Sequence, residues 1–576
     1  MSPNNPAKRV KLTGRAFYES IGSPNMIVAP MVDRSEYAWR LLTRSYLSPS
    51  RNAQTLAYSP MLHARLFSEQ ANFRDAHFNP TKDSLVSVEK SDKPAFLDGH
   101  PEKDRPLFVQ FCANKPNELL EAARYVAPYC DAVDLNLGCP QGIARAGHYG
   151  AFLQEDWDTI HAMIRKLRDE LSIPVTAKMR VLDTKEKTLD YARMILDAGA
   201  SILTVHGRRR EQKGHNMGVA DWAMIRHLRE NLPKETVLFA NGNILNAGDI
   251  ESCLETIGVD GIMSAEGNLS DPTIFAERRL RTNEEATVDE EYWWSKTEEG
   301  VGGYRIDSVF RRYMDIIWRD VLEKEPPRRN PLYIPGHATT DEAPVDTTDP
   351  ISSTVFCEEI TATSTPDTSN KRPIDGDEPA AKRHKSRAEQ KKEKMEAVHN
   401  PSLKALQGHL FQLLRPMLSR HTHIRDALAR ARAGNLVAFE RVLELTEAAV
   451  HEGLQAEHEL WQRVQSGDAD AAELEDVYDS RAISEKAKLV LDESESSKAT
   501  RKKYGRPWWV CQPYIRPLPE EALKIGSIQV SKKDMKKQEK TVEQSSQAGV
   551  ADDREGRTNV EVVRRELPQQ EALACG

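Results

Sequence analysis

Eight short apolar runs between residues 26 and 264 constrain the fold of this chain more than any other feature. In chain order they are MIVAPM, AQTLAYSP, LFVQFC, DAVDLN, PVTAKM, SILTVH, TVLFAN and VDGIMS. Helix-like stretches such as residues 156–171 and 188–200, with apolar residues at i, i+3 and i+4, separate most of them. Eight buried strands alternating with helices favour an α/β fold of the (β/α)8 TIM barrel type over an open doubly wound sheet, which usually has fewer strands.

The composition of the first half of the chain predicts its domain boundaries. We expect residues 1–20 to be a disordered basic N-terminus and residues 21–283 to form the TIM-barrel catalytic domain. Within the barrel, residues 66–106 are mostly polar and are predicted to be a peripheral loop after the second strand. Residues 284–330 are predicted to begin a helical domain, because residues 304–325 have the apolar pattern of one amphipathic helix.

The second half of the chain changes character twice. Residues 331–396 are rich in Ser, Thr, Pro and Asp and end in a basic cluster, so we expect a disordered linker that buries too little apolar surface to offset its chain entropy. Helical periodicity returns over residues 397–522, which predicts that the linker interrupts the helical domain. Residues 523–576 are predicted to be a disordered charged tail.

Cysteine usage and charge narrow the class of protein. The seven cysteines are scattered without the spacing of a zinc site or of a disulfide scaffold, so we expect a reducing compartment and no metal. The chain begins without an apolar leader and has no stretch of about 18 apolar residues, so we expect a soluble protein without a membrane partner. Its net charge of −8 disfavours uniform binding to nucleic acid and directs attention to local basic surfaces.

Polar residues follow the predicted strands at the end where a TIM-barrel enzyme builds its active site. In strand order they are Pro30 with Met31, Gln110, Asn136 with Cys139, Lys178, His206, Asn241 with Gly242 and Asn243, and Ala265 with Glu266. Each has an ordinary structural alternative: Lys178 could be a rim lysine, His206 a core histidine and Cys139 a buried packing residue. Their coincidence at one end of successive strands predicts a catalytic pocket instead.

Seven motifs, in this order and spacing, resemble the tRNA-dihydrouridine synthases. They are APMVD (29–33), PLFVQFCANKP (106–116), DLNLGCPQ (134–141), AKMR (177–180), VHGRRREQKG (205–214), FANGNI (239–244) and MSAEGN (263–268). The resemblance covers residues 22–280. It continues in GHLFQLLRP (408–416) and WWVCQPYIRPLP (508–519), which are similar to the eukaryotic subgroup that acts on positions 16 and 17 of tRNA.

This resemblance implies a flavin-dependent oxidoreductase that reduces D-loop uridines of tRNA to 5,6-dihydrouridine. It implies FMN as cofactor and NADPH (or NADH) as reductant. Hydride would reach C6 of uracil, and Cys139 would give a proton to C5 from the opposite face. A thiol with an ordinary pKa of about 8.5 is mostly protonated at neutral pH and can serve as this acid.

The resemblance also assigns contacts to FMN. Pro30, Met31 and Val32 would lie against the flavin ring, Gln110 on its pyrimidine edge, Lys178 near N1 and O2, and His206 close to flavin or substrate. The phosphate would lie at Asn241, Gly242, Asn243, Ala265 and Glu266, after strands seven and eight. Many bacterial relatives have Gly-Arg where this chain has Ala265 and Glu266, so backbone N–H groups are expected to bind the phosphate here.

Local basic surfaces would hold the RNA. Residues 404–432 contain six Lys or Arg and a single acid, Asp426, and the alternative interpretation is a solvated helix face. With the barrel beside it, this segment predicts binding of the tRNA D-loop and elbow. The residues assigned to substrate binding are Asn136, Arg208, Arg209, Arg210, Arg415, Arg420 and Arg425.

Two basic runs predict a further partner. PAKRVKL (6–12) and KRPIDGDEPAAKRHK (371–385) are typical of nuclear import signals, so we expect an import receptor and a location in the nucleus and/or cytoplasm. Separately, we expect the protein to be a monomer. Two alternatives to the main interpretation stay open. One is an FMN-dependent dehydrogenase acting on a free pyrimidine, and the other is a non-catalytic tRNA-binding protein.

Overall fold

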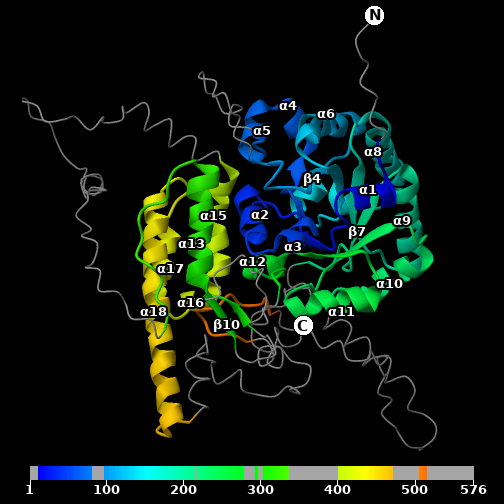
Figure 1. Cartoon of the computed structure of the whole chain (residues 1–576). Helices are drawn as coiled ribbons and strands as arrows, with labels where there is room; N and C mark the ends of the chain where they lie inside the picture. Colours follow the sequence, from blue (N-terminus) through cyan, green and yellow to red (C-terminus); the bar gives the residue numbers. More distant parts are fainter. Residues whose placement is uncertain are drawn as a thin grey trace, which may run out of the picture.

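The computed structural model of the chain consists of a parallel β-barrel with a bundle of helices beside it (Figure 1). It describes residues 11–80, 97–213, 217–277, 292–295, 302–335, 400–470 and 505–515. Among these residues, no helix is both long and apolar enough to cross a membrane.

Eight parallel strands close the barrel. They are β1 (Met26–Val28), β2 (Thr55–Tyr58), β4 (Leu107–Cys112), β5 (Ala132–Leu137), β6 (Val175–Arg180), β7 (Ile202–His206), β8 (Val237–Asn241) and β9 (Gly261–Ser264). Closure follows because β1 pairs with both β2 and β9, while β2 also pairs with β4. A short strand, β3 (Leu62–His63), extends the sheet beside β4. The predicted TIM barrel and each of its eight strands are therefore confirmed.

Helices follow the strands, and capping residues in the sequence mark where they begin and end. The barrel helices are α2 (Tyr37–Arg44), α3 (Pro49–Ala53), α6 (Pro116–Val126), α7 (Gly142–Ala146), α8 (Trp157–Glu170), α9 (Lys185–Ala198), α10 (Trp222–Asn231), α11 (Ala247–Ile257) and α12 (Glu266–Ser270), with 3-10 turns η2 (Ala127–Tyr129) and η3 (Gly150–Leu153). Asp156 caps α8 by accepting a hydrogen bond from the Thr159 amide, and Gly199 ends α9 in the left-handed region at φ +116°.

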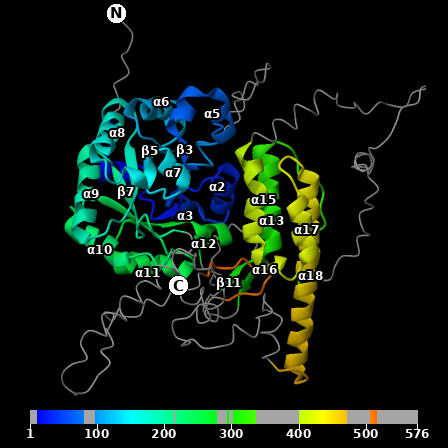
Figure 2. The same ribbon diagram turned by 180° about the vertical axis from the view of Figure 1, so that it is seen from behind.

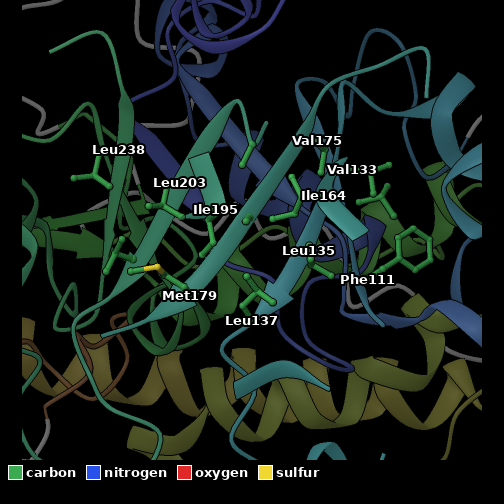
Figure 3. Close-up of a cluster of buried hydrophobic side chains, with 14 of the residues drawn as sticks. Phe111, Val133, Leu135, Leu137, Ile164, Val175, Met179, Ile195, Leu203 and Leu238 are labelled. Atoms are coloured by element: carbon green, nitrogen blue, oxygen red, sulfur yellow. The ribbon is translucent and has the colours of Figure 1, made fainter. Parts of the chain in front are cut away.

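Side chains of the strands alternate between two cores. Outward residues such as Val133 and Leu135 pack with Ile164 of α8 and Ile195 of α9, as Figure 3 shows. Inward residues form a second cluster inside the barrel, with Phe108, Phe239 and Met263 among its members. This alternation leaves the polar residues at the carboxyl ends of the strands above an apolar floor.

An N-terminal helix, α1 (Gly14–Ser20), closes the opposite end of the barrel. Phe17 stacks on Phe108 inside the barrel, and the Tyr18 hydroxyl donates to the carbonyl of Asp260 at 3.2 Å. The prediction of disorder was therefore wrong for residues 11–20, because two aromatic side chains in a basic stretch find partners only after the strands have assembled. Residues 1–10 lie outside the described residues.

The described parts of the polar segment 66–106, residues 66–80 and 97–106, are not peripheral, and for them that prediction was wrong. Its first part lies in α4 (Ala64–Glu69) and α5 (Ala71–His77), and residues 81–96 lie outside the described residues. The guanidinium of Arg40 in α2 forms buried ion pairs with Asp98, at 2.8 Å, and with Asp104. The segment therefore satisfies a buried charge, which would otherwise be costly.

Helices from both sides of the linker form one bundle. They are α13 (Ile306–Ile316), a π-helical turn (Ile317–Val321), α15 (Pro401–Leu413), α16 (Arg415–Leu418), α17 (Thr422–Arg430) and α18 (Leu436–Ser466). A hairpin of β10 (Trp293–Ser295) and β11 (Gly302–Tyr304) adjoins them. The prediction that the linker interrupts a helical domain is confirmed, but its start at residue 331 is not, because Tyr333 accepts a hydrogen bond from Arg305. Residues 336–399 lie outside the described residues.

The bundle and the barrel share a hydrophobic core. All eight residues of α2 are buried, and their apolar side chains cluster with those of α13, α15 and α18. His409 of α15 stacks on Trp39 of α2 with ring centroids 3.9 Å apart, and its Nε2 is 3.0 Å from the Glu36 carboxylate. Trp508 and Trp509 from the C-terminal motif are buried in the same cluster. Figures 1 and 2 show the bundle standing along one side of the barrel.

Candidate active site

Cys139 lies in a turn that the structure holds at both sides. The Asn136 side-chain oxygen accepts hydrogen bonds from the amides of Gly138, at 3.0 Å, and Cys139, at 2.9 Å. The Arg180 guanidinium donates to the Gly138 carbonyl at 2.7 Å. Gly150, at φ +64°, passes so close that a Cβ there would lie 3.0 Å from Cys139 Cβ. The half-buried thiol is therefore fixed at the carboxyl end of β5.

Asn136 was predicted to bind substrate; in the structure its side chain forms hydrogen bonds within the protein, and the substrate contact stays a prediction. Besides bracing the turn, its amide donates to Gln110 Oε1 at 2.8 Å. Gln110 is fully buried and donates in turn to the Asp134 carboxylate at 2.7 Å. Asn136 therefore positions Cys139. The predicted contact between Gln110 and the flavin stays a prediction.

Asp134 was missed by sequence reasoning and lies within the barrel under this network. Its carboxylate accepts hydrogen bonds from Thr176 and Gln110. Burial raises the pKa of Asp134 to about 6, against those hydrogen bonds and the charge of Lys178, which lower it. The signal was present in DAVDLN, because the period of two places Asp134 and Asn136 on the same face of the strand.

Lys178 is an amine whose charge the site suppresses. Its Nζ donates to the Asn241 side-chain oxygen across the barrel at 2.8 Å. Burial, with repulsion from Arg180, lowers the pKa of Lys178 to about 7, although Asp134 and Cys139 oppose the shift. An anion arriving at the barrel mouth would favour the protonated amine.

The corner between β7 and β8 is braced by Arg208. This side chain is only 3% exposed and donates to the carbonyls of Met217 and Gly218 and to Asn243 Oδ1. Its Nη1 also lies 3.2 Å from His206 Nε2. The burial does not fit the predicted contact of Arg208 with tRNA phosphate. Arg208 instead holds the loop after β7 against the one after β8.

Two glycines near the predicted phosphate corner serve packing within the protein. A Cβ on Gly242, at φ +108°, would lie 2.7 Å from the Ala220 Cβ, and one on Gly267 would lie 2.5 Å from the Ile244 carbonyl. Asn241 is fixed by a hydrogen bond to the Met263 carbonyl at 2.9 Å. Ala265 precedes the short helix α12, which begins at Glu266, and both residues are partly exposed.

The donor set fits a flavin mononucleotide. Lys178 offers an amine that a negatively charged flavin ring would keep protonated. Met31 offers a partly buried apolar surface next to the hydrophobic cluster inside the barrel. Pro30 and Val32 flank Met31 on the loop after β1, with Val32 49% exposed. The individual contacts with Pro30, Met31, Val32, His206, Asn241, Gly242, Asn243, Ala265 and Glu266 stay predictions.

Three cations surround the Phe152 ring near the Cys139 turn, and sequence reasoning missed Phe152 and Arg145. The side chains of Arg145, Arg210 and Lys213 lie within 5.1, 5.3 and 6.0 Å of its centroid. Lys213 also donates to the carbonyl of Pro140, next to Cys139, at 2.7 Å. Arg210 pairs with Glu155, and the exposed Arg209 lies 3.7 Å from Asp183. These residues lie in separate loops, so their proximity depends on the fold.

The predicted cations of the helical segment are on its surface. Arg415 and Arg420 are exposed, and the Arg420 guanidinium lies 5.9 Å from the centroid of a Trp508 ring. Arg425 is also exposed but pairs with Asp426 at 3.2 Å. All three are open to solvent, as phosphate contacts require.

Comparisons with known proteins agree with this architecture. The family model of the dihydrouridine synthases (Dus) matches residues 27–300. The tRNA-dihydrouridine(16/17) synthase [NAD(P)(+)] of Saccharomyces cerevisiae is 37% identical over 520 residues, covering 90% of this chain and 90% of that protein. Its Schizosaccharomyces pombe counterpart is 38% identical over 511 residues, covering 88% and 92%. The chain belongs to the dihydrouridine synthase family.

Two other comparisons are more limited. A mouse tRNA-dihydrouridine(16/17) synthase [NAD(P)(+)]-like protein is 48% identical over 271 residues, covering 46% of this chain and 51% of that protein. A crystal structure of mandelate oxidase with (S)-2-phenylpropionate has a TM-score of 0.27 at 15% identity, covering 44% of this chain and 66% of that one. At that score the likeness carries no argument about the site.

Proposed function

We propose that this chain is an FMN-dependent tRNA-dihydrouridine synthase that reduces the uridines at positions 16 and 17 of the D-loop with NADPH. The observation that carries the proposal is the Cys139 turn, fixed by Asn136 and Arg180 beside the Lys178 amine. The names of the two yeast relatives, each aligned over about nine tenths of its length, support the position and a nicotinamide reductant.

The proposed reaction adds two electrons and two hydrogens across the C5–C6 bond of uracil. FMN, when bound, would supply the hydride for C6 of the uracil. The Cys139 thiol gives its proton to C5, so the negative charge that develops on the uracil is neutralised. Asn136 and Arg180 keep the turn rigid, which holds the thiol in position for that transfer.

Lys178 and the corner after β8 and β9 would hold the cofactor. Protonated Lys178 would offset the negative charge of the reduced ring, and Met31 would lie against the ring face. Backbone amides near Ala265 and Glu266 would receive the phosphate.

The helical segment would bind the tRNA elbow, and the protein would act as a monomer. A uridine in the elbow must turn out of its stack to reach the barrel, and that extrusion costs a few kcal/mol. Contacts of Arg415, Arg420 and Arg425 with phosphates would offset the cost and make affinity fall as salt rises.

The basic runs at 6–12 and 371–385 would bind an import receptor and place the protein in the nucleus, with a cytoplasmic pool before import.

Mass mapping of dihydrouridine tests this proposal. Purified protein, FMN, NADPH and unmodified tRNA should give dihydrouridine at positions 16 and 17, and Cys139→Ala should give none. A tRNA with cytidine at both positions is the matched control. Reduction of free uracil at a rate equal to that of tRNA would favour the free-pyrimidine dehydrogenase. Binding of tRNA without flavin or reduction would favour the non-catalytic RNA-binding protein.

A further inference from the structure

Four exposed apolar side chains belong to segments at the carboxyl end of the barrel. Val32, Ile143 and Val219 follow β1, β5 and β7 and are 49%, 66% and 48% exposed. Phe411, on α15, is 36% exposed and is the only aromatic residue of the four. Single exposed apolar residues are common on protein surfaces, so exposure alone does not make Phe411 a binding residue.

Contacts on both sides of Phe411 hold its part of α15 against the barrel mouth. Gln412 donates to the Ser270 hydroxyl at 2.9 Å, and Ser270 ends α12, which follows β9. Gly408 lies directly against the guanidinium of Arg34, three residues beyond Met31. Figure 2 shows α15 beside α2 and α12. Phe411 therefore lies next to the loops that carry the predicted flavin contacts.

One cation lies on the same face of α15 as Phe411, and a second follows just beyond the end of that helix. Lys404 and Phe411 are seven residues apart, and Arg415 follows four residues later at the start of α16. At 3.6 residues per turn Lys404 and Phe411 lie along one face of α15, and Arg415 lies just beyond the end of that helix. All three side chains are exposed. An exposed aromatic ring between two cations has the composition of a surface for single-stranded nucleic acid.

We propose that Phe411 stacks on an unpaired base next to the target uridine, while Lys404 and Arg415 contact the phosphates on either side. The proposal rests on the proposed function and makes it more specific, because it predicts recognition of a loop whose bases are splayed out. Paired bases in a stem expose no face for stacking, whereas loop bases commonly stack on aromatic side chains. The site selects for an open loop and is indifferent to base identity.

Affinity for tRNA tests the proposal. Replacing Phe411 with Ala should weaken tRNA binding about 5- to 150-fold, the equivalent of about 1–3 kcal/mol per stacked base. Phe411→Leu should lose as much, and Phe411→Tyr should retain parental affinity. Measurements of binding by fluorescence anisotropy, with FMN content and flavin reduction by NADPH in parallel, separate RNA binding from the cofactor site.

Two control variants complete the experiment. Trp461→Ala removes another exposed aromatic, 48% exposed near the end of α18, and should leave binding unchanged. Arg415→Ala should reduce the slope of log affinity against log salt by about 1, whereas Phe411→Ala should leave that slope unchanged. Parental affinity in Phe411→Ala, or recovery of affinity by Phe411→Leu, would overturn the proposal. Failure of the parent protein to bind and reduce tRNA would instead reject the proposed function.

Discussion

Replacing Lys178 with Met tests the electrostatics of the site because it removes an amine that the fold keeps partly neutral. The pKa of Lys178 falls from an ordinary 10.5 to about 7, chiefly through burial. At about 1.36 kcal/mol per pKa unit, the charged form is about 4–5 kcal/mol less stable in the flavin-free protein than in water. Met has a similar length and no charge, so Lys178→Met should remove this penalty.

The sign of the pH dependence follows from the direction of this shift. The folded pKa lies below the unfolded one, so the unfolded chain binds the extra proton between about pH 7 and 10.5. The contribution of Lys178 to stability therefore rises with pH through that window and is least favourable below pH 7. Flavin-free Lys178→Met should be more stable than the parent near neutral pH by up to a few kcal/mol, and the advantage should disappear near pH 10.5.

Function should change in the opposite direction. Without the cation, negative charge on the reduced flavin is uncompensated, so FMN should bind more weakly and its potential should become more negative. Denaturant unfolding of the flavin-free parent and variant at about pH 6, 8 and 10 measures how Lys178→Met changes the free energy of unfolding. Lys115→Met, an exposed lysine 2.7 Å from Glu118, is the control. If the free energy of unfolding of Lys178→Met equalled that of the parent at every pH, and the reduction potential of its flavin were unchanged, the reasoning would be refuted.

Three other variants test separate parts of the molecule. Cys139→Ala should keep FMN and its reduction by NADPH while nearly abolishing dihydrouridine formation, and parental turnover at saturating tRNA would contradict its role as acid. Arg208→Ala should lower FMN retention without changing the salt dependence of tRNA binding, since the buried guanidinium donates its hydrogen bonds within the protein. A smaller salt slope in this variant would restore the predicted phosphate contact. His409→Ala should destabilise the whole protein by about 1–3 kcal/mol, because it removes a hydrogen-bond partner of the buried Glu36 carboxylate. Thermal unfolding of the full chain measures this, and an unchanged midpoint would contradict a contribution of this contact to stability.

The order of the barrel strands and the residues at their carboxyl ends could be predicted from local patterns in the sequence. Apolar runs of strand length are a local signal, and a parallel barrel necessarily brings those ends together. The order and spacing of the seven motifs pointed directly to the family. The flavin-binding barrel and its cysteine could therefore be predicted from the sequence alone. Helices such as α8 and α18 were predictable for the same reason, since their apolar spacing is local.

Tertiary structure decided which polar residues are free and which are engaged. Arg208 and Arg415 look alike in sequence, yet one is buried among carbonyl groups and the other is exposed, because only the assembled loops after β7 and β8 surround Arg208. Asp134 acquires its raised pKa from burial, which no local pattern measures.

Tertiary structure also joined the two parts that the sequence separates. Residues 304–325 and 400–430 resemble the start and continuation of an independent helical domain, but their apolar faces pack with α2 of the barrel. Glu36 and His409 are 373 positions apart and meet at 3.0 Å. Helical periodicity identifies an apolar face without identifying its partner, and the partner is fixed only when chain folding brings distant surfaces together.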